Sequence, residues 1–422
     1  MKMRLLLAFF IFVVSTCLAE TKIIAHIVVD PGEFERENCP VSVSINGLNI
    51  NIYEGIILQE IIDSQFIQQA CQIEPGNSPK LCWILKGITK PGNKRYFRLL
   101  AGKTSTENES TGVKVLLDNN SVKIIQNRKY VLQYNYTPVS PPDGIDSIYT
   151  RSAFIHPLWT PSGEVLTRIQ PPDHYHHMGI WNPWTKTKFE GREVDFWNLG
   201  KGQGTVRFKT FTSLINGPVF GGFKAVQEHV DLNAPGGEKT AINEVCEARV
   251  WNISGEEAEN WLWDFTSTLN CATDSQLLIE KYRYAGLGFR ATELWTNKNS
   301  EIITSEGKTR KDADATKARW CNVYGKMIDG KAGILFMSHP YNRQHPEPMR
   351  IWPENSNGGR GDVFFEFCPI RNNDWLIQPG KDYVLHYRMY VYNGEISTKF
   401  AEQLWTDFAF PPGVKIELLN NK

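Results

Sequence analysis

Short apolar runs with a period of two residues, separated by turn-forming dipeptides, limit the fold of this 422-residue chain more than any other feature. Successive side chains of a strand point to opposite faces, so such alternation indicates a sheet with one packed face. The run 261–269 shows the pattern most clearly, and Pro-Gly or Asn-Gly pairs mark turns nearer the N-terminus. The sequence therefore predicts an all-β protein.

One segment, 397–408, is the exception and is expected to be helical. Ser397 or Thr398 would cap its first turn, and Phe400 and Leu404 fall on one apolar stripe. Two prolines follow the segment and would end the helix, because proline lacks the backbone N–H that a helix needs.

The chain divides into four predicted segments. Residues 1–19 have the basic start, apolar stretch and small-residue exit of a signal peptide. Residues 20–102 should form a small N-terminal β-sandwich, and the polar segment 103–112 a linker. Residues 113–415 should form a large domain of two stacked antiparallel sheets, a supersandwich, and hold twelve of the thirteen tryptophans.

The signal peptide predicts export to the periplasm or the extracellular space. A lipid anchor at Cys17 is not expected, since Thr16 suits such a site poorly, and no later stretch has the roughly eighteen apolar residues that would span a bilayer. Without Lys2 and Arg4 the chain has two more acidic than basic side chains, so no nucleic-acid partner is predicted.

Seven cysteines would remain after cleavage, without a CxxC pair or other metal-like spacing. Cys71 and Cys82 could bridge a hairpin in an oxidising compartment. For most of the seven, burial in the reduced form is the expected state. The sequence also lacks the GxSxG, P-loop and HExxH motifs of common hydrolases, NTPases and zinc proteases.

The strongest functional feature is the loop 173–177, which contains three of the nine histidines and one carboxylate. Imidazole titrates near neutral pH and is the commonest metal ligand. Asp173, His174, His176 and His177 are therefore candidate catalytic residues. A zinc site needs three or four ligands, so a divalent metal is not favoured and the cofactor stays open.

A second histidine-containing loop, 338–348, is stiffened by prolines and contains His339, Arg343, His345 and Glu347. Either these side chains only stabilise an exposed loop, or they complete the first cluster. We expect at least one of His339, Arg343 and His345 to share a pocket with His174 or His176, and we count His339 and His345 as catalytic candidates.

Several further residues are candidates because aromatic and polar side chains occur beside loop-forming residues. Aromatic rings can stack on the apolar face of a sugar, although a tryptophan more often fills a β-core. Glu366 lies within an apolar strand, where burial would favour its protonated form, as either a structural or a catalytic acid. The candidate substrate-binding residues are Trp181, Arg192, Asp195, Asn198, Tyr284, Arg290, Arg343 and Trp352.

Five ordered motifs resemble the PmoA-like family, and the resemblance extends over about 113–412. It implies a β-rich domain comparable to the galactose mutarotase-like supersandwich, and settings of sugar catabolism. The family's "methane oxygenase" label does not suit a chain without membrane helices. The motifs are 156–167, 172–179, 195–198, 304–309 with Arg319 and Trp320, and 339–348.

Three functions follow as hypotheses. The first is an exported carbohydrate-active enzyme, a hydrolase, lyase or epimerase, that uses histidine and carboxylate acid-base chemistry on a carbohydrate ligand. The second is a non-catalytic glycan-binding protein that uses tryptophan and arginine. The third is a metal-dependent oxidoreductase, as the label of the PmoA-like family suggests.

Overall fold

The computed structural model describes residues 22–48, 50, 55–102, 112–254 and 259–418. The predicted signal peptide 1–19 and nearly all of the predicted linker 103–112 lie outside them. The fold is nearly all β, as predicted, with 52% strand, one α-helix and several antiparallel sheets. No helix in the described part of the chain is long and apolar enough to cross a membrane.

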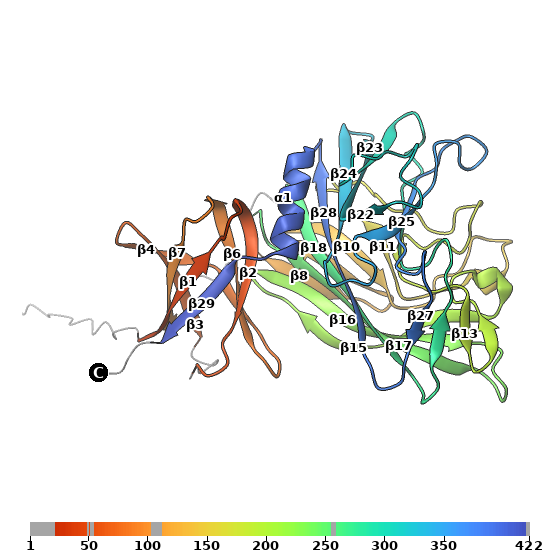
Figure 1. Ribbon diagram of the computed structural model, residues 1–422, viewed down its shortest axis with the longest axis horizontal. Helices are drawn as coiled ribbons and strands as arrows, with labels where there is room; N and C mark the ends of the chain where they lie inside the picture. Colours follow the sequence, from red (N-terminus) through yellow and green to blue (C-terminus); the bar gives the residue numbers. More distant parts are fainter. Residues whose placement is uncertain (1–21, 49, 51–54, 103–111, 255–258, 419–422) are drawn as a thin grey trace, which may run out of the picture.

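Two sheets near the N-terminus form a small β-sandwich (Figure 1). The five-stranded sheet has the order β29-β1-β7-β3-β4 and the three-stranded sheet the order β2-β6-β5. They enclose a core that includes Ile27, Leu58, Trp83 and Phe97. The strands are β1 (Ile23–Asp30), β2 (Arg36–Ser44), β3 (Ile56–Ile62), β4 (Gln65–Gln69), β5 (Cys71–Glu74), β6 (Lys80–Thr89), β7 (Arg95–Ala101) and, from the C-terminus, β29 (Gly413–Leu418).

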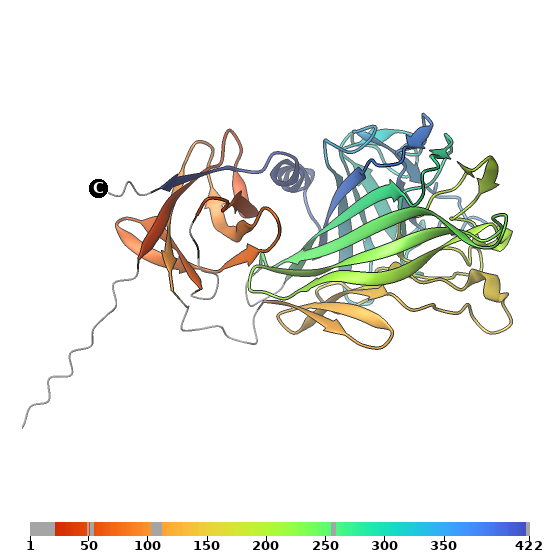
Figure 2. The same cartoon turned by 90° about the horizontal axis from the view of Figure 1, so that it is seen from below.

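The C-terminal strand β29 crosses back to this sandwich and pairs antiparallel with β1, where Ile416 is opposite Ile27. Figure 2 shows both ends of the described chain in the same lobe. The predicted end of the large domain, residue 415, falls inside β29. The division into two domains stays a prediction, and a cut inside 103–112 alone would leave β29 attached to the N-terminal sheet.

The large β-region contains sheets of nine, eight and four strands with the orders β22-β25-β26-β20-β12-β11-β10-β9-β8, β15-β16-β17-β18-β28-β24-β23-β21 and β14-β13-β19-β27. From Trp263 to Leu269 in β18, buried positions alternate with half-buried ones. The two larger sheets pack face to face, and Phe289 of β20 contacts Phe336 of β24 with ring centroids 5.1 Å apart. Apolar residues from both sheets form one continuous core.

The strands of the nine-stranded sheet are β8 (Val113–Leu117), β9 (Ser121–Gln126), β10 (Lys129–Asn135), β11 (Phe154–Leu158), β12 (Ile180–Trp181), β20 (Leu287–Arg290), β22 (Lys317–Ala318), β25 (Glu347–Ile351) and β26 (Phe364–Phe367). Those of the eight-stranded sheet are β15 (Gly204–Ile215), β16 (Phe220–Asp231), β17 (Lys239–Trp251), β18 (Asn260–Cys271), β21 (Ser300–Thr304), β23 (Trp320–Lys326), β24 (Lys331–Ser338) and β28 (Tyr383–Asn393). The small sheet contains β13 (Thr187–Phe189), β14 (Arg192–Val194), β19 (Leu277–Ile279) and β27 (Trp375–Ile377).

The helix α1 (Thr398–Ala409) lies between the two lobes (Figure 1). Its N-cap is Ser397, whose hydroxyl accepts a hydrogen bond from the backbone N–H of Phe400 at 3.1 Å. Near its end, Asp407 forms a buried ion pair of 2.8 Å with Arg36 of β2. The helix therefore joins the small sandwich to the large β-region.

All seven cysteines from Cys39 onward are free thiols in the structure, so Cys71 and Cys82 are not bridged. Burial raises the pKa of Cys71 to about 11 and that of Cys82 to about 12. Both thiols are therefore protonated and unreactive at neutral pH.

Candidate functional site

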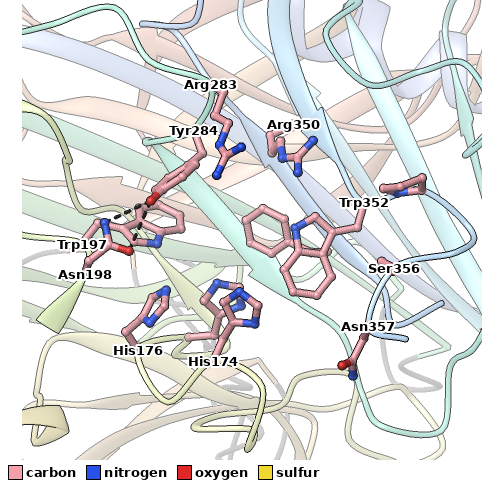
Figure 3. A pocket seen from close by; sticks show the side chains of 13 residues that line it. His174, His176, Trp197, Asn198, Arg283, Tyr284, Arg350, Trp352, Ser356 and Asn357 are labelled. Atoms are coloured by element: carbon pink, nitrogen blue, oxygen red, sulfur yellow. Dashed lines mark hydrogen bonds between the residues drawn. The ribbon is translucent and has the colours of Figure 1, made fainter. Parts of the chain in front are cut away.

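A pocket of about 420 Å³ opens beside the histidine loop (Figure 3). This volume is within the usual range for small-molecule sites. The residues around it come from the loops before β12 and β20, the segment after β14, and β25, β26 and the loop between them. They are His174, His176, His177, Trp197, Asn198, Arg283, Tyr284, Arg350, Trp352, Pro353, Ser356, Asn357 and Phe364.

The histidine loop is held in shape by its own backbone. The N–H of His174 donates to the carbonyl of Pro171 at 2.9 Å, and the N–H of His177 donates to the carbonyl of His174 at 3.0 Å. Gly179 follows with a positive φ of 68°, and a Cβ there would lie 2.4 Å from the carbonyl oxygen of Ile155. Only glycine fits this position without a shift of the backbone, so the loop meets β12 in a fixed orientation.

Asp173 and His174 form a carboxylate–imidazole pair, with Oδ2 and Nδ1 2.8 Å apart. Asp173 also pairs with Arg290 at 2.8 Å, and Arg290 pairs with Asp362 at 2.8 Å. Burial raises the pKa of Asp173, but the hydrogen bond from His174 and the charge of Arg290 outweigh it and lower the pKa to about 2. An ionised carboxylate can only accept, so His174 donates to Asp173 from Nδ1, and its Nε2 takes no part in this pair.

The other two imidazoles are neutral. Burial lowers the pKa of His176 to about 4, and it lowers the pKa of His177 well below its usual value. The ring of His177 stacks on Phe364 at 5.0 Å and lies 4.6 Å from the ring of His174. At neutral pH both side chains shape the floor of the pocket without adding charge.

Tyr284 and Asn198 form the wall beside the histidines, where Figure 3 shows the hydroxyl and the amide facing each other. The hydroxyl accepts a hydrogen bond from Asn198 Nδ2 at 3.0 Å and lies 3.2 Å from Oδ1, to which it can donate. Burial raises the pKa of Tyr284 to about 12, so the hydroxyl keeps its proton. The fully buried Asp195 fixes Asn198 by accepting from its backbone N–H at 2.9 Å and its Nδ2 at 2.8 Å.

Trp352 lines the pocket, and the guanidinium of Arg290 lies 4.6 Å from the centroid of its ring. Two further arginines, Arg283 and Arg350, extend into the same space (Figure 3). Sequence reasoning missed both. Arg283 could have been predicted as a site residue because it is next to the candidate Tyr284 in the sequence. No residue close to Arg350 in the sequence indicates that it lines the pocket.

The second histidine loop, 338–348, does not line the pocket. The prediction that the two histidine loops share one pocket is therefore wrong. His339 packs on Phe408 of α1 at 5.0 Å, and His345 stacks on Trp405 of α1 at 6.1 Å. Arg343 donates to the carbonyl of Asp374 at 2.6 Å. The imidazoles of this loop fill the space under the helix, and none of the three side chains lines the pocket.

Three other candidates, Trp181, Arg192 and Glu366, also lie outside the lining of the pocket. Trp181 is 2% exposed and belongs to the core, so it offers no stacking face to a ligand; the neighbouring Trp184 is fully buried too. Arg192 pairs with Asp231, away from the pocket. Glu366 is fully buried, accepts from the backbone N–H of Ala285, and has a pKa raised well above its usual value by burial.

Among residues 22–418, apart from the undescribed gaps, no group of three or more His, Cys, Asp or Glu side chains is arranged to hold a metal ion.

Residues 121–406 match the model of one protein family, described as a Family of unknown function (DUF6807). The chain belongs to this family. The resemblance to the PmoA-like family was therefore wrong, since the match is to DUF6807. The matched range includes every residue that lines the pocket and excludes every strand of the N-terminal sandwich.

Comparison with solved structures finds an alpha-mannosidase from Enterococcus faecalis V583, 10% identical with a TM-score of 0.41, where the match covers 93% of this chain and 46% of that chain. A Glycosyl Hydrolase Family 38 protein from Enterococcus faecalis is 11% identical with a TM-score of 0.40 and coverages of 93% and 47%. Heparan sulfate lyase HepC from Pedobacter heparinus is 11% identical with a TM-score of 0.31 and coverages of 70% and 38%. The match thus spans less than half of each of these proteins, whose names describe carbohydrate-active enzymes. No curated protein matches the chain.

Proposed function

We propose that this DUF6807 protein is a carbohydrate-active enzyme in which His174 and Tyr284 transfer protons to and from a sugar bound against Trp352. The observation that carries the proposal is the Asp173–His174 pair at the edge of a pocket with an aromatic wall. A base oriented by a carboxylate is a recurring catalytic arrangement, and aromatic faces suit the apolar side of a pyranose ring.

The two proposed groups differ in what they can do with a proton. Ionised Asp173 keeps the proton of His174 on Nδ1, so Nε2 can accept one from the substrate. Tyr284 holds its proton at neutral pH and can donate it to a leaving or developing oxygen. The pair therefore provides a base and an acid in one pocket.

The side chains that line the pocket favour removal of a proton from a sugar carbon over hydrolysis of a glycosidic bond. Glycoside hydrolysis generally uses two carboxylates that flank the scissile bond. No Asp or Glu side chain is among the described residues that line this pocket. Removal of a proton from a sugar carbon, as in a lyase or an epimerase, needs only the base and acid that are present, so we favour these two reactions over hydrolysis.

The test is deuterium exchange. The protein would be incubated in D₂O with a panel of neutral and acidic sugars and oligosaccharides, and NMR would detect deuterium at a sugar carbon. His174→Ala should slow uptake by about 10²- to 10⁴-fold, the usual contribution of a general base. His339→Ala is the matched control, because that imidazole lies under α1 outside the pocket.

Binding of a sugar without exchange or product would favour the non-catalytic glycan-binding function. Exchange that survives in His174→Ala would refute the assigned base. The predicted signal peptide is the sole support for export, which stays part of the proposal and is tested by fractionating the producing cells.

A further inference from the structure

We infer that the sugar bound in this pocket carries a carboxylate, and that Arg283 and Arg350 hold it. The inference rests on the proposed function, since it names the substrate class of the same site. Its basis is the charge of the pocket, the position of the two guanidinium groups and the chemistry of proton removal from carbon.

The two arginines bring more positive charge than their neighbours neutralise. Asp314 pairs with both Arg350, at 2.8 Å, and Arg371, at 3.3 Å, so two guanidinium groups share one carboxylate. Arg283 is exposed and has no carboxylate partner among the described residues, and its guanidinium lies 5.8 Å from the centroid of the Tyr284 ring. An anion from outside the chain would balance this charge.

The acidic groups nearest the pocket do not supply that balance. Asp173 and Asp362 are both paired with Arg290. Asp195 is fully buried and paired with Lys201 at 2.8 Å. Each of these carboxylates already has a cation. Arg283 therefore has no carboxylate partner among the described residues, and Arg350 has only the share of Asp314 that Arg371 leaves, so part of their positive charge remains for a ligand.

The geometry places the proposed anion away from the base. In Figure 3 Arg283 and Arg350 point into the pocket from one side, and His174 and His176 from the opposite side, with the face of Trp352 alongside. A sugar ring against Trp352 can therefore present a carboxylate to the guanidinium groups while a ring carbon faces His174. A planar carboxylate suits the planar fork of donors on arginine.

The same arrangement favours the proposed proton transfer. A proton on the carbon next to a carboxylate is hard to remove while the carboxylate keeps its full negative charge. Guanidinium groups that neutralise this charge stabilise the negative charge that develops when His174 takes the proton. A neutral sugar would leave the two arginines without this role.

The experiment is isothermal titration calorimetry with matched sugars: galacturonate against galactose, glucuronate against glucose, mannuronate against mannose, and galactose 6-sulfate. At least one uronate should bind about tenfold or more tightly than its neutral partner, as expected for a charge-assisted hydrogen bond. Arg283→Ala should remove most of that preference, and Arg350→Gln should lower it. Arg207→Ala is the control, since Arg207 is exposed on β15 and paired with Glu238 outside the pocket.

The outcomes separate the two claims. Equal binding of uronates and neutral sugars overturns the inference but leaves the proposed function in place. A preference for the sulfated sugar overturns the assignment of a carboxylate. Absence of binding by every sugar in the panel overturns both claims. Circular dichroism would check that each variant is folded, and Arg283→Ala decides the result if Arg350→Gln does not fold, because the Arg283 side chain is exposed.

Discussion

Replacement of Asp173 by asparagine should weaken the fold by an amount that depends on pH. The pKa of Asp173 falls from 3.8 to about 2, with burial opposing the fall and His174 and Arg290 causing it. One pKa unit corresponds to about 1.4 kcal/mol, so the ionised form contributes about 2 kcal/mol to the free energy of unfolding. Asparagine keeps the shape of the side chain but loses this charge. At pH 7 we therefore expect Asp173→Asn to cost about 2 kcal/mol.

The sign of the pH dependence follows from the lowered pKa. A carboxyl group whose pKa is lower in the folded state stabilises the protein above its unfolded pKa, and this contribution is lost as the pH falls toward the folded pKa. The difference between wild type and Asp173→Asn should thus be constant from pH 7 to about pH 5, and shrink between about pH 4 and pH 2.

Urea unfolding of both proteins at pH 7, 5, 4 and 3, followed by circular dichroism, measures this difference. Asp118→Asn is a useful comparison. The pKa of Asp118 is also lowered, first by a hydrogen bond from the backbone N–H of Asn120, but the side chain is exposed and does not line the pocket. A cost of Asp173→Asn that is near zero at pH 7, or that stays the same at pH 3, would refute the role of Asp173 as an ionised partner of His174 and Arg290.

Three further predictions address the loop, the aromatic wall and the second histidine loop. Gly179→Ala should lower the urea midpoint of unfolding by more than Gly163→Ala does. A Cβ at Gly179 would collide with the backbone of Ile155, whereas a Cβ at Gly163 would face open space. Equal effects of the two substitutions would contradict the close approach of Gly179 to Ile155. Trp352→Ala should weaken sugar binding in calorimetry by about tenfold with a small change in melting temperature, and unchanged affinity would remove the stacking role. Burial raises the pKa of Glu347 to about 7, so the wild type should lose stability as the pH rises from about 4.5 to 7. Glu347→Gln should lose less stability over that range, and parallel pH profiles of the two proteins would show that Glu347 titrates normally.

Local patterns in the sequence predicted most elements of the fold. The alternation in 261–269 marks β18, and the cap at Ser397 marks the start of α1 within one residue. Both signals lie within a single element, where side-chain periodicity and capping act. The pairing of β29 with β1 could not be predicted in this way, because it joins residues almost 400 positions apart and depends on the tertiary fold.

The sequence predicted only part of the site, because its residues come from segments that are far apart in the chain. Three histidines of the loop 173–177, His174, His176 and His177, line the pocket, together with Asn198, Tyr284 and Trp352. The loop 338–348 is also rich in histidine, yet it packs under α1. Composition identifies residues capable of chemistry, but only the three-dimensional arrangement decides which of them share a cavity. The sequence predicts that Trp181 binds a ligand because it lies beside loop-forming residues, but its side chain is part of the core.

The most direct test of the central claim is a crystal structure of the protein with the sugar that binds most tightly in the calorimetric panel. We predict a sugar ring stacked on Trp352, a ring carbon facing His174 Nε2, and a carboxylate on Arg283 and Arg350. A sugar bound outside this pocket, or one that leaves His174 without a contact, would contradict the account.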